Sequence, residues 1–419
     1  MNKKKIAVIG LGYVGLPLAV EFAKQRNVIG FDIDHNRIQE LLNGVDRTKE
    51  LQAEELADLD GLKLTSDEKN LSESNFYIVT VPTPVDVNKK PDLSYLISAS
   101  ELVGRYLKVG DIVVYESTVF PGCTEEICVE ALSRVSGLKF NIDYFCGYSP
   151  ERINPGDKER NLKNIVKVTS GSTPEIAKIV DEIYGEIIEA GTFLVDSIKI
   201  AEASKVIENI QRDLNIAFMN ELSIIFDHLD IDTQSVLDAS STKWNFLNFS
   251  PGLVGGHCIS VDPYYLTSKS ELMGYIPDLI NSARRLNDGM PKVVVEKLLR
   301  KMNIKGISVK DARVLVMGVT FKEDCPDLRN TKVFAIIEEL QNITKRVDIF
   351  DNVASKDQLE SFSIVDYPEK NNYDAILICV PHREIIDIGI KKISKFCKSN
   401  SVIFDLKSKF PEEYSDLRL

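Results

Sequence analysis

IAVIGLGYVGLPLAV, residues 6–20, joins an apolar run to a helical pattern through a glycine-rich turn. Gly10, Gly12 and Gly15 follow the order G-x-G-x-x-G where a strand should end and a helix begin. In such a turn the first glycine permits a sharp bend, the second lets backbone amides approach a pyrophosphate, and the third lets strand and helix pack closely. The motif therefore predicts the first strand-turn-helix unit of a dinucleotide-binding sheet.

The residues around this turn indicate which dinucleotide it binds. Tyr13 and Val14 lie inside the motif, where the helix N-terminus offers backbone N–H groups to an anion. Asp32 ends the next apolar run, 22 residues after Gly10. An acid in this place binds the ribose of NAD and repels the additional phosphate of NADP. We therefore predict NAD as the cofactor; a glycine turn in a sheet that binds nothing is the alternative.

Apolar runs alternate with helical patterns through the first third of the chain. The runs are KIAVIG (5–10), NVIGFDID (27–34), FYIVTVPTP (76–84), DIVVYESTV (111–119) and DYFCGYSPER (143–152). This alternation predicts a parallel sheet, whose carboxyl edge faces the ligand. Thr83 and Thr118 each follow one of these runs and are candidates to donate hydrogen bonds to the cofactor, although ordinary turn chemistry at a strand end also accounts for them.

Residues 197–232 form one helical pattern without glycine or proline. The pattern exceeds the usual length of a globular helix and predicts a spine that joins two halves of the chain. A second helical pattern covers residues 276–302, in which Pro291 predicts a boundary or a kink.

Strand-helix alternation returns in the last third of the chain. The segments are ARVLVMGVTFKED (312–324), TKVFAIIEELQN (331–342), RVDIFDN (346–352), YDAILICVP (373–381) and SVIFDLK (401–407). We therefore predict an α/β protein with two Rossmann-like doubly wound domains joined by a long central helix and a helical dimerisation region. The expected limits are 1–196 for the NAD-binding domain, 197–303 for the central helical domain and 304–419 for the C-terminal domain.

Composition excludes several classes of protein. A net charge of −12 argues against a nucleic-acid binder, which usually presents a basic face. The seven cysteines include no C-x-x-C pair and the four histidines are scattered, so we expect neither a disulfide framework nor a bound metal. No apolar run is long enough to span a bilayer, and the glycine-rich start is not expected to be a signal peptide. We expect a protein of the reducing cytoplasm, with no nucleic-acid or membrane partner.

GGHCISVDPYY, residues 255–265, adds a thiol, which hydride transfer alone does not need. Gly255 and the glycine after it leave Cys258 open to a ligand, and Asp262 is a candidate to position or deprotonate a water. A thiolate adds to an aldehyde, and the thiohemiacetal can lose a hydride to give a thioester that water hydrolyses. Cys258 therefore indicates oxidation of a primary alcohol to an acid in two hydride transfers. The alternative is a small buried apolar residue.

Lys205 and Asn209 share one face of the predicted long helix, because they stand at positions i and i+4. Both side chains can donate hydrogen bonds and would suit an oxyanion. From spacing alone, a solvated polar pair is the preferred interpretation.

Separated motifs in a fixed order make the chain resemble the UDP-glucose/GDP-mannose dehydrogenase family over essentially its whole length. They are GLGYVGLP (10–17), VPTP (81–84), ESTV (116–119), SPERINPG (149–156), AEASKVIEN (201–209), GHCISVDPYYL (256–266) and GVTFKEDCPDLRNT (318–331). The resemblance implies oxidation of a nucleotide sugar by NAD. It also implies that the C-terminal sheet holds the UDP group and that the long helix forms the core of a homodimer or higher homo-oligomer.

The resemblance also implies roles for individual residues. For the reaction, the resemblance implies Cys258 as the nucleophile, with Lys205 and Asn209 stabilising the oxyanions. It implies that Asp262 orients water and that Thr118 lies near the reacting carbon. Glu151 is a candidate to activate the hydrolytic water. For binding, the resemblance implies Arg37 and Arg329 beside the cofactor, and Lys322 and Lys407 beside the substrate, which Gly255 lets approach closely.

One position distinguishes branches of the family that this chain resembles. Where the glucose-specific branch has a second glutamate four residues after Glu151, this chain has Pro155. The proline form resembles enzymes that act on UDP-N-acetylglucosamine or UDP-N-acetylgalactosamine for surface polysaccharides, and KWNFLNFSPGLVGGHC (243–258) and QRDLNIAFMNEL (211–222) support that branch. Arg152 is the nearby charge expected to contact the sugar, with a structural ion pair as the alternative. The epimer stays open.

Other functions also remain open at this point. One is a dehydrogenase for UDP-N-acetylmannosamine or UDP-glucose. Another is a single-hydride enzyme of the β-hydroxyacid type, which uses a lysine and an asparagine on a helix but no thiol. The last is a non-catalytic nucleotide-sugar binder or redox sensor, which has no evident need for Lys205, Asn209, Cys258 and Asp262 together.

Overall fold

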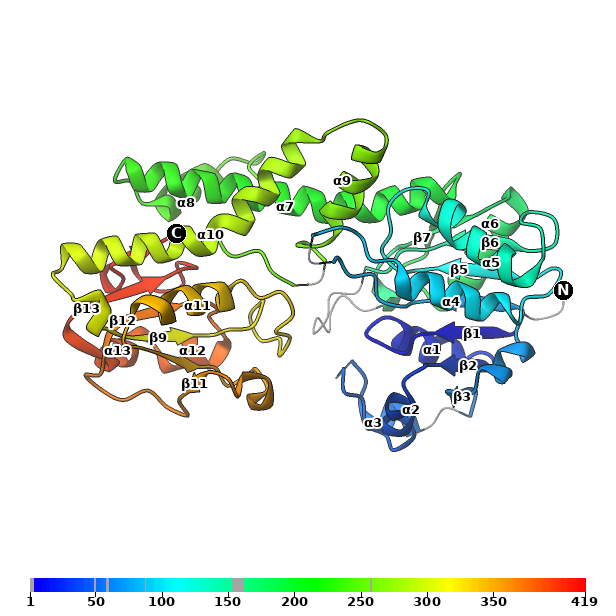
Figure 1. Cartoon of the computed structure of the whole chain (residues 1–419), viewed down its shortest axis with the longest axis horizontal. Coiled ribbons are helices and arrows are strands. Elements are labelled where there is room, and N and C mark those ends of the chain that lie inside the picture. Colours follow the sequence, from blue (N-terminus) through cyan, green and yellow to red (C-terminus); the bar gives the residue numbers. More distant parts are fainter. Residues whose placement is uncertain (1–3, 49, 58–59, 87, 153–161, 257) are drawn as a thin grey trace. The chain divides into compact units, whose positions relative to one another are not determined.

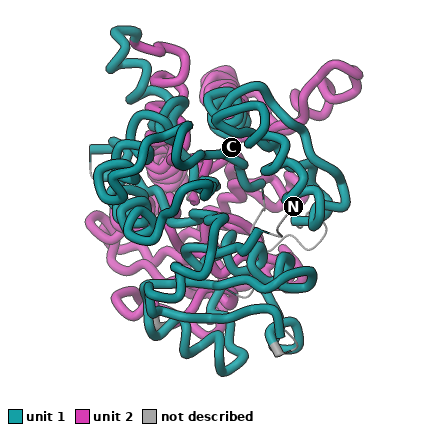
Figure 2. The backbone as a smooth tube through the Cα atoms, turned by 90° about the vertical axis from the view of Figure 1, so that its right-hand side faces the viewer, with its two compact units in different colours: residues 1–208, 264–275 teal, residues 209–263, 276–419 magenta. Residues whose placement is uncertain are grey.

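The computed structural model describes residues 4–48, 50–57, 60–86, 88–152, 162–256 and 258–419 (Figure 1). The chain divides into two compact units, residues 1–208 with 264–275 and residues 209–263 with 276–419 (Figure 2). Each unit contains its own sheet with helices, which confirms the α/β fold with two Rossmann-like domains and a long helix between them. The division falls within that helix, so the limits given above for three domains stay a prediction.

The sheet of the first unit has the strand order β3-β2-β1-β4-β5-β6-β7-β8. Its strands are β1 Ile6–Ile9, β2 Val28–Phe31, β3 Leu62–Thr65, β4 Phe76–Val79, β5 Ile112–Tyr115, β6 Phe145–Tyr148, β7 Lys167–Gly171 and β8 Thr192–Leu194. Strands β1 to β6 pair in parallel, in the order of a doubly wound dinucleotide-binding sheet, and β7 pairs antiparallel to β6. Several of these strands are continuous apolar runs because a parallel sheet is buried on both faces.

Helices α1 Gly15–Ala23, α2 His35–Leu42, α3 Ala53–Ala57, α4 Ser94–Gly104, α5 Val129–Ser136 and α6 Pro174–Gly185 belong to the first unit. Local sequence explains where some of them begin. Asp34 accepts a hydrogen bond from the N–H of Asn36 at the start of α2, and Thr173 accepts one from Ile176 at the start of α6. Such caps satisfy N–H groups that have no partner within the helix.

The second unit repeats this architecture with the strand order β11-β10-β9-β12-β13-β14. Its strands are β9 Arg313–Met317, β10 Arg346–Phe350, β11 Ser363–Ile364, β12 Tyr373–Ile378, β13 Cys397–Asp405 and β14 Leu417–Arg418. Its shorter helices are α8 Thr233–Ser241, α11 Val333–Ile343, α12 Arg383–Ile388 and α13 Ile390–Ile393. All the pairs of this sheet are parallel, so its loops, like those of β1 to β6, leave the carboxyl ends of strands at one edge.

The described residues contain three further α-helices: α7 Ile198–His228, α9 Asp262–Leu272 and α10 Asp278–Ile304. Helix α7 confirms the predicted long helix (green in Figure 1). Helix α10 continues through Pro291, so this proline is not a helix boundary. Buried neighbours such as Met290 and Val294 pack into the core of the second unit, and this packing offsets the hydrogen bond that proline cannot donate.

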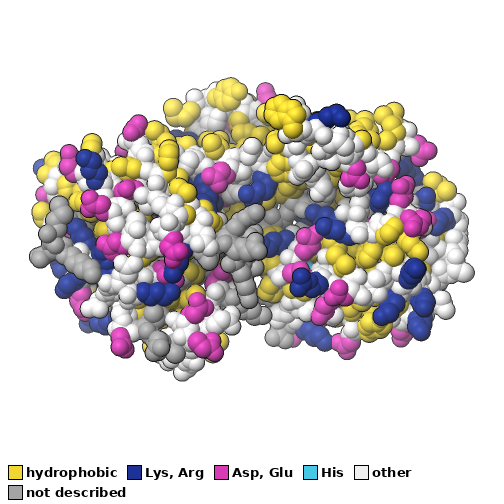
Figure 3. Space-filling view, turned by 180° about the vertical axis from the view of Figure 1, so that it is seen from behind, with side chains coloured by type: hydrophobic (Ala, Val, Ile, Leu, Met, Phe, Trp, Pro, Cys, Tyr) yellow, Lys and Arg dark blue, Asp and Glu magenta, His cyan; other side chains and the backbone are white. Residues whose placement is uncertain are grey.

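No helix in the described ranges is long and apolar enough to cross a bilayer. On the face that Figure 3 shows, basic and acidic side chains are interspersed. The net charge of −12 is therefore not gathered into a single acidic patch on that face.

A buried carboxylate fixes helix α7 within the first unit. Glu202 is fully buried and accepts hydrogen bonds from the N–H groups of Gly122 and Thr124, in the segment that follows β5. Gly122 has a φ of +97°, which favours glycine. Burial raises the pKa of Glu202 to about 7, although both N–H groups oppose the shift.

We predict that Glu202 makes stability fall as pH rises. Because its pKa is higher in the folded chain than its ordinary value of 4.5, its contribution is complete below pH 4.5 and is lost as pH rises through about 7. The shift corresponds to about 3 kcal/mol. A Glu202→Gln side chain cannot titrate, so the wild-type Tm minus the variant Tm should decrease over this range in thermal scans. A difference that stays constant with pH would contradict the prediction.

Candidate active site

The turn after β1 has the geometry that a dinucleotide needs. Gly10 has a φ of +93°, and a Cβ on Gly15 would lie 1.9 Å from the carbonyl oxygen of Gly10. A Cβ on Gly12 would meet nothing within 4 Å, which leaves its backbone open to a ligand. Tyr13 and Val14 are half-buried just before α1. Gly10 therefore allows the bend, Gly15 the close packing of strand and helix, and Gly12 the approach of a ligand.

Asp32 and Arg37 brace this turn from the side of β2 and α2. Asp32 Oδ2 accepts a hydrogen bond from the N–H of Leu11 at 2.8 Å, and Arg37 Nε donates one to the carbonyl of Leu11 at 2.9 Å. Arg37 Nη2 pairs with Asp46 at 2.7 Å, whereas buried Nη1 has no hydrogen-bond partner within the described ranges. A buried guanidinium N–H without an acceptor suits a phosphate. The residues present therefore fit NAD, which would accept the hydride of the reaction.

Thr83 and Thr118 lie at the carboxyl edge of the same sheet. Thr83 follows β4, Thr118 follows β5, and both are half-buried. Ser117 Oγ donates a hydrogen bond to the carbonyl of Val81 at 2.6 Å, which joins the two loops. Both threonines therefore occupy the edge at which a ligand of a parallel sheet binds.

Glu151 and Arg152 follow β6 and reach toward helix α7. Arg152 Nη1 donates to the carbonyl of Lys205 at 3.2 Å, and Arg152 Nη2 forms an ion pair with Glu208 at 2.9 Å. Lys205 is buried on the same turn of the helix. The arrangement brings three predicted site residues together and gives Arg152 the ion pair that was the alternative to a sugar contact.

Glu151 also belongs to a buried network that we did not predict. Its Oε2 pairs with Lys167 Nζ at 2.9 Å, and the same ammonium pairs with Glu116 at 2.6 Å. Tyr184 donates its hydroxyl proton to Glu116. The sequence signal was a lysine inside the apolar run NIVKV, residues 164–168, but sequence does not identify the partners of a buried charge.

In the second unit, Asn209 and Asp262 are in direct contact. Asn209 Nδ2 donates to Asp262 Oδ2 at 2.5 Å, and both side chains are buried. The N–H of Asp262 donates to the carbonyl of Cys258 at 2.8 Å, in the turn that starts α9. Cys258 is half-buried, unlike the other six cysteines, which are buried. These contacts bring together a partly exposed thiol, a carboxylate and an amide.

The glycine loop before Cys258 packs against the loop that follows β9. A Cβ on Gly255 would lie 2.8 Å from the carbonyl oxygen of Asn330, and one on Gly256 would lie 2.9 Å from the ring of Phe321. Asn330 Nδ2 donates to the carbonyl of Gly256 at 3.1 Å. The close packing explains why this segment has two glycines, and it places the Cys258 loop beside the segment that contains Lys322.

A cavity in the second unit is bordered by Lys322, Lys407, Gly255, Thr320, Thr331 and Val380 among others. Burial lowers the pKa of Lys407, with Glu323 opposing the shift. Lys332 and Glu323 also line the cavity, so three lysines and one carboxylate stand beside the glycine loop and form an environment suited to an anionic ligand. Arg329 does not line this cavity; it is exposed and pairs with Asp327 at 2.6 Å.

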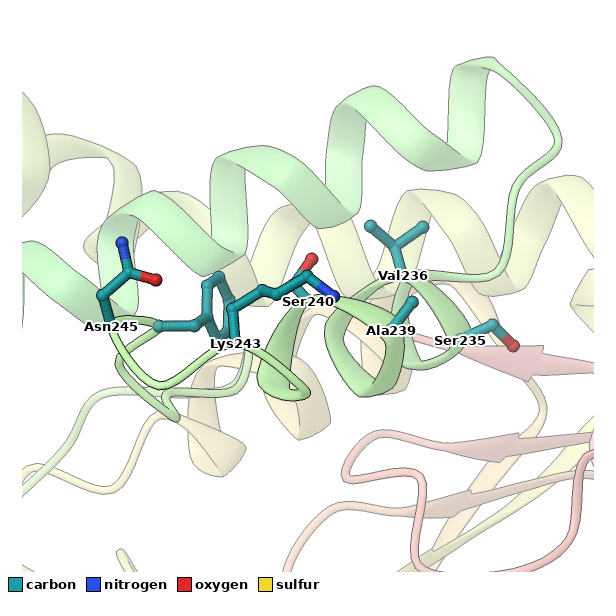
Figure 4. A pocket seen from close by; sticks show the side chains of 7 residues that line it. Ser235, Val236, Ala239, Ser240, Lys243 and Asn245 are labelled. Atoms are coloured by element: carbon teal, nitrogen blue, oxygen red, sulfur yellow. The ribbon is translucent and has the colours of Figure 1, made fainter.

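A larger cavity in this unit lies apart from these residues. It is lined by Ser235, Val236, Ala239, Ser240, Lys243, Asn245 and Phe246, on α8 and the segment that follows it (Figure 4). Lys243 is the only titratable side chain in that lining, so the cavity lacks the groups that the chemistry needs. Within the described residues, no group of three or more His, Cys, Asp and Glu side chains could hold a metal ion.

Some sequence predictions are not addressed by these contacts. Pro155 lies outside the described residues. Lys205 and Asn209 are one turn apart on α7, but Lys205 belongs to the first compact unit and Asn209, Cys258 and Asp262 to the second.

Comparison with known proteins identifies the chain. Residues 4–188 match the NAD binding domain of the UDP-glucose/GDP-mannose dehydrogenase family, residues 199–289 its central domain, and residues 315–411 its UDP binding domain. UDP-N-acetyl-D-glucosamine 6-dehydrogenases from Pseudomonas aeruginosa and Salmonella typhi are 56% and 55% identical to it, over all of this chain and 100% and 99% of theirs.

A solved structure agrees in fold. The UDP-D-ManNAc dehydrogenase of Pyrococcus horikoshii is 30% identical, with a TM-score of 0.88 over 99% of this chain and 98% of that one. The chain therefore belongs to the UDP-glucose/GDP-mannose dehydrogenase family and is an NAD-dependent nucleotide-sugar dehydrogenase.

Proposed function

We propose that this protein oxidises C6 of UDP-N-acetylglucosamine to the uronic acid, with two NAD per sugar and a thioester on Cys258. The observation that supports this most strongly is the half-buried Cys258 on a glycine loop, with Asp262 and Asn209 hydrogen-bonded beside it. An enzyme that removed a single hydride would need no nucleophile there.

The proposed chemistry has four steps. The C6 hydroxyl loses a proton and a hydride, the latter to NAD, and becomes an aldehyde. The Cys258 thiolate adds to the aldehyde carbon and gives a thiohemiacetal. This intermediate loses a second hydride to a second NAD and becomes a thioester. Water then adds to the carbonyl, the C–S bond breaks, and the thiolate is regenerated as the acid leaves.

The proposal divides this work among individual residues. Lys205 and Asn209 stabilise the oxyanions that form in both halves of the reaction. Asp262 orients water, and its hydrogen bond to Asn209 fixes the amide so that the second N–H of Nδ2 can point at the reacting oxygen. Glu151 accepts the proton of the hydrolytic water, and Thr118 contacts the reacting end of the substrate.

The proposal assigns one set of residues to binding of NAD and another set to binding of the nucleotide sugar. For NAD they are Gly10, Gly12, Tyr13, Val14, Gly15, Asp32, Arg37, Thr83, Thr118 and Arg329. For the nucleotide sugar they are Glu151, Arg152, Lys205, Asn209, Gly255, Lys322 and Lys407. The surroundings of half-buried Lys407 support its part, because a partly desolvated cation attracts a diphosphate more strongly than a fully exposed one does.

N-acetylglucosamine is the preferred sugar in this proposal because relatives named as UDP-N-acetyl-D-glucosamine 6-dehydrogenases are 55–56% identical to this chain. A curated relative named as a UDP-N-acetyl-D-mannosamine dehydrogenase, from Methanococcus aeolicus, is 35% identical. The uronic acid would supply surface polysaccharide synthesis in the cytoplasm.

A homodimer or higher homo-oligomer is part of the proposal. Large apolar side chains are exposed on α7 and after α8, where a second copy would cover them: Phe218 at 53%, Ile225 at 45%, Trp244 at 97% and Leu247 at 58%. Exposed apolar surface of this kind marks an interaction site.

Replacing the nucleophile tests the thioester. We expect Cys258→Ser to lower the rate of uronate formation by at least about 1,000-fold, because a serine hydroxyl is far less nucleophilic than a thiolate. The measurement is uronate by mass spectrometry with UDP-N-acetylglucosamine and excess NAD. Cys397→Ala, which removes a buried thiol from β13, should retain wild-type turnover. Wild-type uronate formation by Cys258→Ser would refute the covalent route.

Sugar preference is tested with four substrates side by side. UDP-N-acetylglucosamine should give the highest kcat/KM, and UDP-glucose should give at least about 10-fold less, because a site that binds the acetamido group leaves polar groups unpaired without it. UDP-N-acetylgalactosamine and UDP-N-acetylmannosamine complete the series. A higher kcat/KM with any of the other three would refute the assigned sugar and leave the reaction class intact.

A further inference from the structure

Gly252, in the second unit, is a glycine that its own backbone does not require. Its φ lies outside the left-handed range that favours glycine, so an alanine could adopt the same backbone conformation. The position lacks space instead. A Cβ on Gly252 would lie 2.8 Å from Nζ of Lys407 and 3.2 Å from its Cε. The ammonium of Lys407 therefore occupies the place that a side chain at residue 252 would fill.

One buried side chain fixes the backbone of Gly252. Asn220, on helix α7, accepts a hydrogen bond from the N–H of Gly252 at 2.7 Å and donates one to its carbonyl at 3.0 Å. The amide of Asn220 also donates to Asn287, on α10, at 2.8 Å. Both asparagines are fully buried. Moving Gly252 would leave buried polar groups without partners, so the side chain of Lys407 is the part that yields to a larger residue at 252.

Asn287 extends this anchor into the core of the second unit. Its Nδ2 donates to the carbonyl oxygen of Asp213 at 3.0 Å and to Oδ1 of the same residue at 2.8 Å. Asp213 is fully buried and pairs with Arg284 at 2.6 Å. The segment that contains Gly252 is therefore tied to two packed helices, α7 and α10, by side chains whose hydrogen bonds depend on one another.

Lys407 differs from Lys332, another lysine beside the same cavity, in its charged partners. Lys332 Nζ forms an ion pair with Asp288 at 2.8 Å. In the described part of the chain, Lys407 donates a hydrogen bond through its backbone N–H, to Asp405, and its Nζ has neither an ion-pair nor a hydrogen-bond partner. A half-buried cation of this kind suits a ligand that brings its own negative charge.

We propose that Gly252 is a positioning residue for nucleotide binding: the space left by its missing side chain places the ammonium of Lys407 against the diphosphate of UDP. The inference rests on the nucleotide-sugar site proposed above, in which Lys407 binds the substrate. The match of residues 315–411 to the UDP binding domain of the family, which includes Lys407, supports it. An alanine at 252 would keep its segment in place and displace the ammonium.

Binding of UDP tests this role without any turnover. We expect full-length Gly252→Ala to bind UDP at least about 10-fold more weakly than the wild type in isothermal titration calorimetry, because displacing the ammonium loses a charge-assisted hydrogen bond. Its Tm should stay close to the wild-type value, because the new methyl meets the far end of a flexible side chain and not backbone. The Kd of NAD, measured alongside, should not change.

A double-mutant cycle separates this role from a merely structural one. Lys407→Ala should weaken UDP binding by at least as much as Gly252→Ala does. Gly252→Ala/Lys407→Ala should bind UDP as Lys407→Ala does, because no ammonium is left to displace. If Gly252→Ala alone fails to fold, the comparison of Lys407→Ala with the double variant decides, since the double variant lacks the atoms that the methyl meets.

Gly289→Ala is the matched control. It adds the same methyl within α10 of the same unit, where a Cβ would meet nothing within 4 Å. Its Kd for UDP should equal that of the wild type.

Three results would overturn the inference. The first is a wild-type Kd for UDP in Gly252→Ala, and the second is a wild-type Kd in Lys407→Ala. The third is a further loss of affinity when Gly252→Ala is added to Lys407→Ala, which a structural effect on the segment would produce. Failure of the proposed function looks different: UDP-N-acetylglucosamine would not yield two NADH per sugar, whereas the Kd of UDP would still respond to these variants as stated.

Discussion

The parallel hydrogen-bonded register of the first sheet is the constraint on which the rest of the site depends. Ile9 pairs with Val79, Val79 with Tyr115, and Tyr115 with Tyr148, and each of the four is the last residue of its strand. The loops that begin one residue later therefore start at the same level of one edge. Backbone pairing gathers the dinucleotide turn, the two threonine loops and the Glu151 loop at this edge.

That edge also concentrates charged side chains that are buried. Glu116, Glu151 and Lys167 are all less than a tenth exposed, and fully buried Glu202 fixes helix α7 to the segment after β5. Burying such groups costs free energy, so each has fixed partners. The same partners hold the side chains in single orientations, which is the form of preorganisation that catalysis needs.

Much of the fold could be predicted because local patterns dominate it. The glycine motif at residues 10–15, the alternation of strands and helices, and the helix at α7 follow from period and turn chemistry. The antiparallel strand β7 was not predicted, and α10 continues through Pro291, because tertiary packing decides both. Within the candidate site, residue types pointed to Cys258 and Asp262, whose roles stay predictions. The partners of Arg152 and Lys167 depend on distant segments, which sequence spacing does not encode.

The number of NADH molecules formed per UDP-N-acetylglucosamine consumed tests the central claim most directly. The sugar is made limiting, NAD is kept in excess, and both NADH and residual sugar are measured at completion. A thiol that retains the aldehyde as a thiohemiacetal and then as a thioester predicts two NADH for each sugar. One NADH per sugar, with an aldehyde as the product, would contradict the account of Cys258.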